Sequence, residues 1–487
     1  MKSRPNILLI MADQFRKASL TGQGDGIETP NLDRLLAQGT LFPNAACTSP
    51  LCVPSRASLA TGKYPHRCGV VTADDNLPRD QVTYYQLLRK AGYRVGLVGK
   101  TDLHKAFYPY EGEDGFFVGE NGDLPIIQHL GFTDACETEG KMNSAFVHLN
   151  AEGDFSPSGP YQEYLLRKDP RLLAQHFLAL RKYMTSGQAY FAESSLLPWQ
   201  DNMDAFIGRK ACDFLRQAKK NVPWHLLVSF VGPHNPWDPP VEALEQVQGW
   251  ELSLPPADTM EGKPAWIRKR AARQSGGLTA EQLYRTKQHY AAAVRVIDRA
   301  VGDILDTLRD SGQDEDTIVI FCADHGELMG EHGLFEKKAM YEGALRIPFI
   351  LHIPGKRQPP QSEALVELMD LAPTILDLCG VPYDSTDMDA VSLRPLLEGC
   401  NEPLRQLQKS ELDNTYMLFD GRYKWIHSMN DQDELYDLQQ DPNELNNCIA
   451  EHRDVVKKFK RRYFRPNAVD ARAIQKAMDL LGEGEAQ

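Results

Sequence analysis

Four short apolar runs, separated by segments with helical spacing, most constrain what this chain can fold into. The runs are NILLIMA (6–12), YRVGLVG (93–99), WHLLVSFVG (224–232) and DTIVIFCA (316–323). Apolar spacing between them predicts helices over 29–39, 81–91, 203–219 and 280–311. The first of these has Thr29 as its N-cap, Pro30 at its first position and Gly39 as its stop. This alternation indicates an α/β domain with a mainly parallel sheet.

The domain organisation follows from the length of the chain and from a change of pattern near residue 400. A chain of 487 residues exceeds one ordinary hydrophobic core. We therefore predict a large domain over residues 1–400 and a small C-terminal α+β domain over 401–487, where strand-like pieces precede a basic helix. Residues 105–200 are rich in Gly, Pro and aromatic residues without clear periodicity, so they are interpreted as loops and insertions.

Charge and cysteine usage exclude several classes of protein. Asp and Glu total 67 against 54 Lys and Arg, and the formal charge of -13 argues against nucleic acid or an anionic membrane as the main partner. The cluster KKFKRRYFR (457–465) could bind an anionic partner, but we favour a solvated helix face or a subunit contact in a homo-oligomer. Nine scattered cysteines without CxxC pairs suggest neither a disulfide framework nor a zinc site. The run 7–12 is too short for a signal peptide and no run spans a membrane, which predicts a cytoplasmic protein.

Polar residues follow each apolar run directly. They are Asp13, Lys100 with His104, His234, and Asp324 with His325. In open α/β sheets, ligands bind beyond the carboxyl ends of the strands. Four segments that are far apart in the sequence are therefore expected to converge on one pocket.

A cysteine opens a further predicted helix in the stretch SPLCVPSRASLATG (49–62). Arg56 lies one turn after Cys52 on the same face, and the N-terminus of the helix presents free N–H groups there, so the two features form a cradle for an anion. These residues alone leave three interpretations of Cys52: an inert buried thiol, a nucleophilic thiolate, or the precursor of another group.

The segment CVPSRASLATG matches the CxPSR signature of the type I sulfatases, which belong to the alkaline phosphatase superfamily. Companion segments of that family also stand in the expected order: PNILLIMADQ, GLVGKTDLH, VGPHNPW, ADHGELMGEHGLFEK and YEGALRIPF. The resemblance spans about residues 5–350, and ELYDLQQDPNELNN resembles the family's C-terminal domain. It implies an alkaline-phosphatase-like α/β/α sandwich and a sulfuric ester hydrolase for a small or carbohydrate sulfate, with aryl sulfates as model substrates.

The resemblance also implies how the reaction proceeds. The side chains that would carry it are Cys52, Arg56, Lys100, His104, His234 and Lys337. A maturation enzyme would oxidise Cys52 to formylglycine, whose hydrate attacks sulfur and later ejects sulfate by re-forming the aldehyde. Arg56, Lys100 and Lys337 would bind sulfuryl oxygens, although the neighbouring Lys338 keeps the last choice open. His234 would protonate the leaving alcohol, and His104 would orient the hydrate or take a proton when the sulfated intermediate collapses.

A divalent cation held by carboxylates fits the same chemistry, because it acts as a Lewis acid and lowers the pKa of a bound hydroxyl. The expected ligands are Asp13, Gln14, Asp324, His325 and, by resemblance, the modified Cys52. Many sulfatases have a second aspartate where this chain has Gln14, which supplies either a ligand oxygen or a hydrogen bond to a ligand. Oxygen-rich sites favour Ca²⁺, and the imidazole is also compatible with Mn²⁺ or Mg²⁺. Glu327 is interpreted as a structural or supporting residue.

Two other functions remain open at this point. A phosphonate monoester or phosphodiester hydrolase of the same superfamily also uses formylglycine, and its first strand can carry an Asp-Gln pair like Asp13 and Gln14. A non-catalytic anion-binding protein would instead bind metal and sulfate without turnover.

Overall fold

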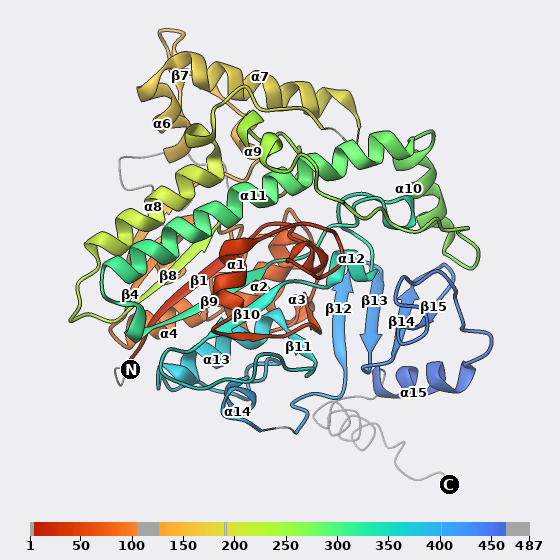
Figure 1. The fold of residues 1–487 in the computed structure, drawn as a ribbon. Coiled ribbons are helices and arrows are strands. Elements are labelled where there is room, and N and C mark those ends of the chain that lie inside the picture. The colour runs from red at the N-terminus through yellow and green to blue at the C-terminus, as the bar shows by residue number, and fades with distance from the viewer. Residues whose placement is uncertain (1–3, 105–125, 189, 191, 401, 464–487) are drawn as a thin grey trace, which may run out of the picture.

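A seven-stranded sheet forms the centre of the molecule (Figure 1). The computed structural model describes residues 4–104, 126–188, 190, 192–400 and 402–463. In spatial order the strands are β2 (Thr40–Leu41), β10 (Phe349–His352), β9 (Thr317–Ala323), β1 (Asn6–Ala12), β8 (Trp224–Ser229), β4 (Arg94–Gly99) and β5 (Asp134–Glu137). The strands from β9 to β5 run parallel, whereas β10 is antiparallel to both β9 and β2. The predicted mainly parallel sheet is confirmed.

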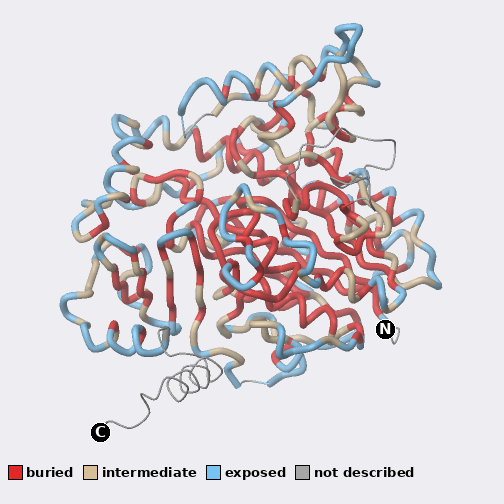
Figure 2. Tube along the Cα trace, turned by 180° about the vertical axis from the view of Figure 1, so that it is seen from behind, coloured by how far each residue is buried: buried red, intermediate tan, exposed pale blue. Residues whose placement is uncertain are grey.

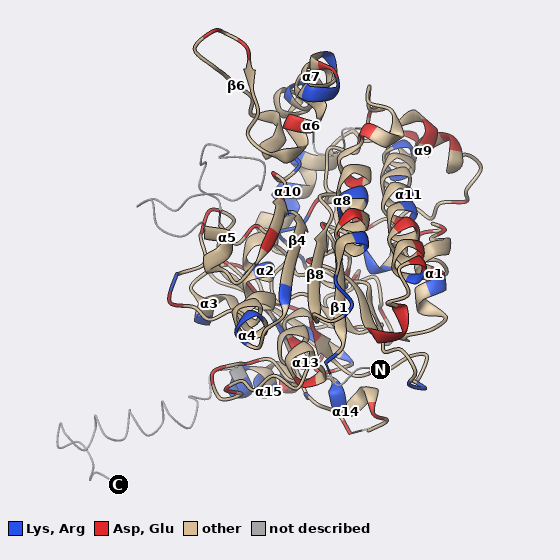
Figure 3. Ribbon diagram, turned by 90° about the vertical axis from the view of Figure 1, so that its left-hand side faces the viewer, with Lys and Arg blue, Asp and Glu red and all other residues tan. Residues whose placement is uncertain are grey.

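Helices cover both faces of this sheet, which is why its central strands are buried throughout and read as continuous apolar runs (Figure 3). One face carries α1 (Pro30–Leu36), α8 (Met203–Gln217) and α11 (Ala280–Asp310). The other face carries α2 (Cys52–Thr61), α4 (Tyr84–Lys90) and α13 (Leu371–Leu378). Figure 2 shows the buried residues concentrated in these three layers. The α/β/α sandwich is confirmed, and the four helices predicted between the runs are present with ends shifted by a few residues.

Shorter elements lie in the connections. They are β3 (Ala45–Ala46), α3 (Pro65–Cys68), α5 (Ile126–His129), β6 (His148–Leu149), β7 (Phe155–Ser156), α9 (Val241–Gln246), α10 (Ala265–Ser275), α12 (Glu342–Leu345), β11 (Val366–Glu367) and α14 (Arg394–Leu397). Of the helices in the described part of the chain, none combines the length and the apolar composition that a membrane crossing requires.

The interpretation of residues 105–200 as loops is wrong for part of that range. Two helices, α6 (Pro160–Lys168) and α7 (Pro170–Ser186), occupy it, whereas 105–125 lie outside the described residues. Each helix begins with proline at its first position, and Asp169 caps α7 by accepting a hydrogen bond from the Arg171 N–H. Helix α7 buries one side chain every three or four residues, at Leu173, His176, Leu180 and Tyr183. This periodicity is present in the sequence, but the Gly- and Pro-rich flanks hide it.

A four-stranded antiparallel sheet and a helix follow residue 400. The elements are β12 (Gln408–Leu412), β13 (Thr415–Phe419), β14 (Tyr423–Ser428), β15 (Glu434–Asp437) and α15 (Arg453–Tyr463). Helix α15 packs Val456 and Phe459 against Trp425, and its basic residues from 457 to 462 are exposed. The described basic residues are thus exposed in this chain, which fits both a solvated helix face and a subunit contact, and the choice between them stays a prediction; residues 464–465 lie outside the described residues.

We expect the substitution Gly99→Ala to destabilise the fold strongly. Gly99 ends β4 with φ at 99°, and an added Cβ would lie 1.9 Å from the Ser229 carbonyl oxygen. The clash adds to the cost of a left-handed alanine, so the free energy of unfolding should fall by at least about 2 kcal/mol in urea titrations. Gly355 is the matched control, because its φ is 69° and nothing lies within 4 Å of its added Cβ. Equal losses in Gly99→Ala and Gly355→Ala would contradict the steric argument.

Candidate active site

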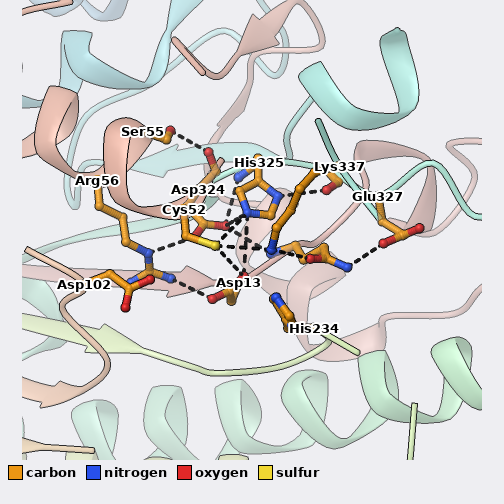
Figure 4. Close-up of polar contacts among 12 residues, drawn as sticks. Asp13, Cys52, Ser55, Arg56, Asp102, His234, Asp324, His325, Glu327 and Lys337 are labelled. Atoms are coloured by element: carbon orange, nitrogen blue, oxygen red, sulfur yellow. Dashed lines mark hydrogen bonds and ion pairs between the residues drawn. The ribbon is translucent and has the colours of Figure 1, made fainter. Parts of the chain in front are cut away.

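The carboxyl ends of four neighbouring strands bring together polar side chains from distant parts of the sequence. β4, β8, β1 and β9 are adjacent in the sheet, and Asp13, Lys100 and Asp324 each follow the last residue of their strand. His234 lies in the loop after β8 (Figure 4). Parallel neighbours end at the same edge, so these residues share one site.

Helix α2 delivers Cys52 to the same edge of the sheet. Cys52 is its first residue, and all ten residues of the helix are buried. The Cys52 Sγ atom lies 3.2 Å from Lys337 Nζ, 3.3 Å from His325 Nε2 and 3.9 Å from Asp13 Oδ1 (Figure 4). The N-terminal end of the helix therefore points into the centre of the polar group.

The surroundings of Cys52 differ from those of the inert cysteines. Burial and the Asp13 carboxylate act to raise the pKa of the Cys52 thiol, but Lys100, Lys337 and His325 outweigh them and hold that pKa well below its ordinary value. In contrast, burial raises the pKa of Cys47 and of Cys322 above the ordinary value. Cys52 therefore lies in an electropositive environment, which argues against an inert thiol.

Arg56 is clamped between the carboxylates. Its side chain is buried and donates from Nε to Asp324 Oδ2 at 2.8 Å, and its Nη2 lies 3.5 Å from Asp13 Oδ2. Its Nη1 donates to the Lys100 carbonyl oxygen at 2.9 Å and to Ser229 Oγ at 2.7 Å. In this arrangement Arg56 orients the carboxylates, and its predicted contact with a sulfuryl oxygen stays a prediction.

Two lysines bring positive charge to the centre of the site. Lys100 Nζ donates to Asp13 Oδ2 at 2.5 Å and lies 2.7 Å from Asp102 Oδ2. Lys337 Nζ lies 3.2 Å from Cys52 Sγ, as described above, whereas the neighbouring Lys338 is exposed. The structure therefore brings Lys337, and not Lys338, to the site.

The two predicted histidines occupy different positions. His234 is half-buried, and its Nδ1 lies 2.6 Å from the Asn235 carbonyl oxygen, so that nitrogen carries the proton and Nε2 stays available. Burial acts to raise the pKa of Asp13, but Lys100, followed by His234, Lys337 and Arg56, outweighs it and holds that pKa well below its ordinary value. His104 is half-buried at the last described position before residue 105, and its role stays a prediction.

Four side chains offer ligand atoms to a cation. One ligand atom from each of Asp13, Cys52, Asp324 and His325 lies within 4.8 Å of the others, and we refer to these residues as the cation group. His325 Nδ1 lies 2.9 Å from the Gly326 carbonyl oxygen, so that Nε2, 3.3 Å from Cys52 Sγ, is the ring nitrogen that faces the other members of the cation group. Two buried carboxylates and an imidazole fit a divalent ion such as Ca²⁺ or Mn²⁺.

Three further residues lie beside this site; of these, Glu327 was expected to be structural or supporting, and its contact with Gln14 agrees with that expectation. Ser229 is the last residue of β8 and accepts a hydrogen bond from Arg56; its only signal is a hydroxyl within an apolar run. Asn235 and Glu327 both contact the side-chain nitrogen of Gln14, and Glu327 is fully buried. Those contacts depend on how distant loops meet, which spacing along the chain does not show.

Comparisons with known proteins identify the family and support the fold. A family model described as Sulfatase matches residues 5–381, and a model described as the C-terminal part of N-sulphoglucosamine sulphohydrolase matches residues 330–467. An arylsulfatase of Clostridium perfringens is 28% identical over 466 residues, covering 92% of this chain and 90% of that protein. A choline-sulfatase of Rhizobium meliloti is 28% identical over 473 residues, covering 93% and 84%. The solved structure of a phosphonate monoester hydrolase from Silicibacter pomeroyi aligns with a TM-score of 0.73 at 23% identity, covering 95% of both chains, and supports the fold.

Proposed function

Because this chain belongs to the sulfatase family and is therefore an enzyme that hydrolyses sulfate esters, we propose that it does so through a formylglycine at position 52 and a divalent metal ion. The observation that carries the proposal is the position of Cys52 at the start of α2, in contact with Lys337 and His325 and beside Asp13. The proposal requires a maturation enzyme that oxidises Cys52.

Two groups would supply chemistry that the twenty ordinary side chains lack. Position 52, once converted, would provide a hydrated aldehyde as nucleophile that can regenerate itself, and a divalent ion in the cation group would provide a Lewis acid beside it. The ligands we propose for the ion are Asp13, Gln14, Asp324, His325 and position 52.

The chain's own residues perform the remaining tasks. Lys100 and Lys337 hold fixed positive charge next to position 52, where it offsets the charge on the sulfuryl oxygens. Arg56 keeps the Asp324 carboxylate in place, and that carboxylate would assist deprotonation at position 52, where a bound ion would add Lewis acidity. His234 donates a proton from Nε2 to the oxygen of the leaving alcohol, because its Nδ1 is engaged with the backbone.

Parallel assays on two substrates test this proposal. Protein from a host that makes formylglycine would be given para-nitrophenyl sulfate and bis(para-nitrophenyl) phosphate, with Cys52→Ala as the control. We expect a peptide mass at position 52 about 18 Da below that of the thiol, preferential cleavage of the sulfate, and loss of activity in the variant. An unmodified thiol together with full activity in Cys52→Ala would refute the mechanism.

Gln14 is the observation that favours a second candidate function. An Asp-Gln pair after the first strand resembles the phosphonate monoester and phosphodiester hydrolases of the same superfamily, and the Gln14 side-chain oxygen lies 2.7 Å from Lys337 Nζ in the site. A higher kcat/KM for the phosphodiester than for the sulfate ester would favour that function.

Lys337 and Lys338 form a matched pair of neighbouring lysines for a test of sulfuryl binding. We expect Lys337→Ala to lower kcat/KM for an aryl sulfate by about 100-fold or more, because fixed charge at the reacting group is lost. Lys338→Ala should leave kcat/KM unchanged, because that side chain is exposed. Steady-state kinetics on both variants check this, and similar losses in the two would show that Lys337 has no specific role.

A further inference from the structure

Gln14 is held in an unusual conformation at the end of β1. Its φ is 65°, in the left-handed region that few residues other than glycine adopt, and its side chain is fully buried. Its backbone N–H donates to Asp324 Oδ1 at 3.0 Å, within the cation group. Its side-chain Oε1 accepts from Lys337 Nζ at 2.7 Å, and the same Nζ lies 3.2 Å from Cys52 Sγ. The amide oxygen of Gln14 therefore faces Lys337, on the side of the amide where Cys52 lies.

The nitrogen of the same amide is engaged on the opposite side. Gln14 Nε2 donates to Glu327 Oε2 at 2.5 Å and to Asn235 Oδ1 at 3.2 Å. A lysine ammonium can only donate hydrogen bonds. Both side-chain oxygens of Glu327 accept hydrogen bonds in this structure, Oε2 from Gln14 Nε2 and Oε1 from two backbone N–H groups. A reversed amide would direct its NH₂ group at the Lys337 ammonium and its oxygen at the Glu327 carboxylate. The partners thus permit one orientation of the amide.

Glu327 and Asn235 are themselves fixed by other parts of the chain. Glu327 Oε1 accepts backbone hydrogen bonds from Met329 at 2.8 Å and from Glu336 at 2.6 Å, and its side chain is fully buried. The Asn235 Nδ2 atom donates to Glu336 Oε1 at 3.0 Å, which leaves Asn235 Oδ1 facing Gln14. Figure 4 shows Glu327 on the far side of Lys337 from Cys52. The amide of Gln14 is therefore oriented by groups that cannot turn freely.

We infer that Glu327 is a positioning residue: with Asn235 it locks the Gln14 amide so that its oxygen, and not its nitrogen, faces Lys337 and the cation group. This inference rests on the proposed function, because an oxygen aimed at the cation group matters most when an ion is bound there. A carboxylate presents an oxygen to the ion in either orientation, whereas a glutamine amide can present its oxygen or its nitrogen. Glu327 fixes the orientation in which the oxygen is presented.

The variant Glu327→Gln replaces one carboxylate oxygen, which accepts hydrogen bonds, with an NH₂ group, which donates them. Its oxygen is needed for the Met329 and Glu336 N–H groups, so its NH₂ would face the NH₂ of Gln14 and force that amide to turn. We expect its affinity for Mn²⁺, followed by the EPR signal of the free ion with Ca²⁺ as competitor, to fall by about 10- to 100-fold. The thermal midpoint, measured alongside, shows whether the variant is folded.

The reciprocal double variant Gln14→Glu/Glu327→Gln separates positioning from a structural role. In it a carboxylate at position 14 accepts from the NH₂ at position 327 and presents its second oxygen to Lys337, while the hydrogen bond to Asn235 Oδ1 is lost. Mn²⁺ affinity should therefore rise again from the Glu327→Gln value toward that of the wild type. If Glu327 only held its own loop together, Glu327→Gln would lower Mn²⁺ affinity by the same factor in the Gln14→Glu background as in the wild type, whereas positioning predicts that it raises affinity in the Gln14→Glu background.

A matched control and the wild-type protein complete the design. Glu331→Gln alters a glutamate of the same loop that pairs with Arg16, and it should leave Mn²⁺ affinity unchanged. Wild-type affinity in Glu327→Gln, or failure of the double variant to recover, would overturn this inference while the proposed function stands. A wild-type protein that takes up neither Mn²⁺ nor Ca²⁺ would overturn the metal role in the proposed function and this inference together.

Discussion

In the Cys52→Ser variant, we expect cleavage of an aryl sulfate to stop after a single turnover and to leave sulfate bound covalently to the enzyme. A serine at the start of α2 offers one hydroxyl in the position that the Cys52 Sγ atom occupies near Lys337 and His325. That hydroxyl can attack sulfur, but it has no second hydroxyl with which to eject sulfate. Steady-state kcat should fall by at least about 10⁴-fold.

Intact mass spectrometry and burst kinetics check this result. We expect one equivalent of para-nitrophenol per enzyme and a mass gain of about 80 Da, the mass of the added SO₃ group, since the serine ester is stable without a second nucleophile. Cys52→Ala is the control and should show neither burst nor mass gain. Continued turnover by both variants would mean that position 52 is not the nucleophile.

Replacing Arg56 is expected to have the largest effect on stability of any single change at the site. The substitution Arg56→Ala leaves the buried carboxylates of Asp324 and Asp13 without their guanidinium partner. Removing one partner from a buried ion pair typically costs about 3–5 kcal/mol, because the remaining charge is uncompensated. We expect chemical denaturation to show a loss of this size, and we expect activity to fall below detection in the folded fraction.

Two companion variants distinguish the cause of that loss. Arg56→Lys keeps the charge but cannot reach Asp324, Ser229 and the Lys100 carbonyl at once, so it should recover only part of the stability. Arg394→Ala removes an exposed ion pair with Glu398 and should change stability by no more than the error of the measurement. Equal stability of wild type and Arg56→Ala would show that the carboxylates do not depend on Arg56.

The parallel part of the sheet was predictable because continuous apolar runs are typical of strands buried on both faces. β10 and β2 were not predicted, because strands of four and two residues are too short to carry a periodic signal. β5 was missed for a different reason: its sequence DACE is only partly buried at the edge of the sheet and lacks an apolar run. The spacing of the buried residues of α7 was sufficient to predict a helix, but the Gly- and Pro-rich composition of its flanks led us to interpret the segment as loops.

The candidate site likewise contains residues that the sequence predicted and features that it could not predict. Asp13, Lys100 and Asp324 were readable because each directly follows a strand, and the carboxyl ends of parallel strands meet. The orientation of Gln14 was not readable, because it depends on Glu327 and Asn235, which come from loops more than 200 residues away along the chain. The exposure of Lys338 beside the buried Lys337 likewise depends on how their loop packs.

The burial of α2 determines when Cys52 can be oxidised. Cys52 is 7% exposed, and every other residue of the helix is buried as well. An enzyme that converts the thiol, as proposed, must take the thiol and the neighbouring backbone into its own active site, and the folded chain presents neither. If position 52 is converted as proposed, conversion has to precede the closure of the sheet and its helices around it. Folding and conversion would then compete, and the active fraction of a preparation would report which of the two was faster.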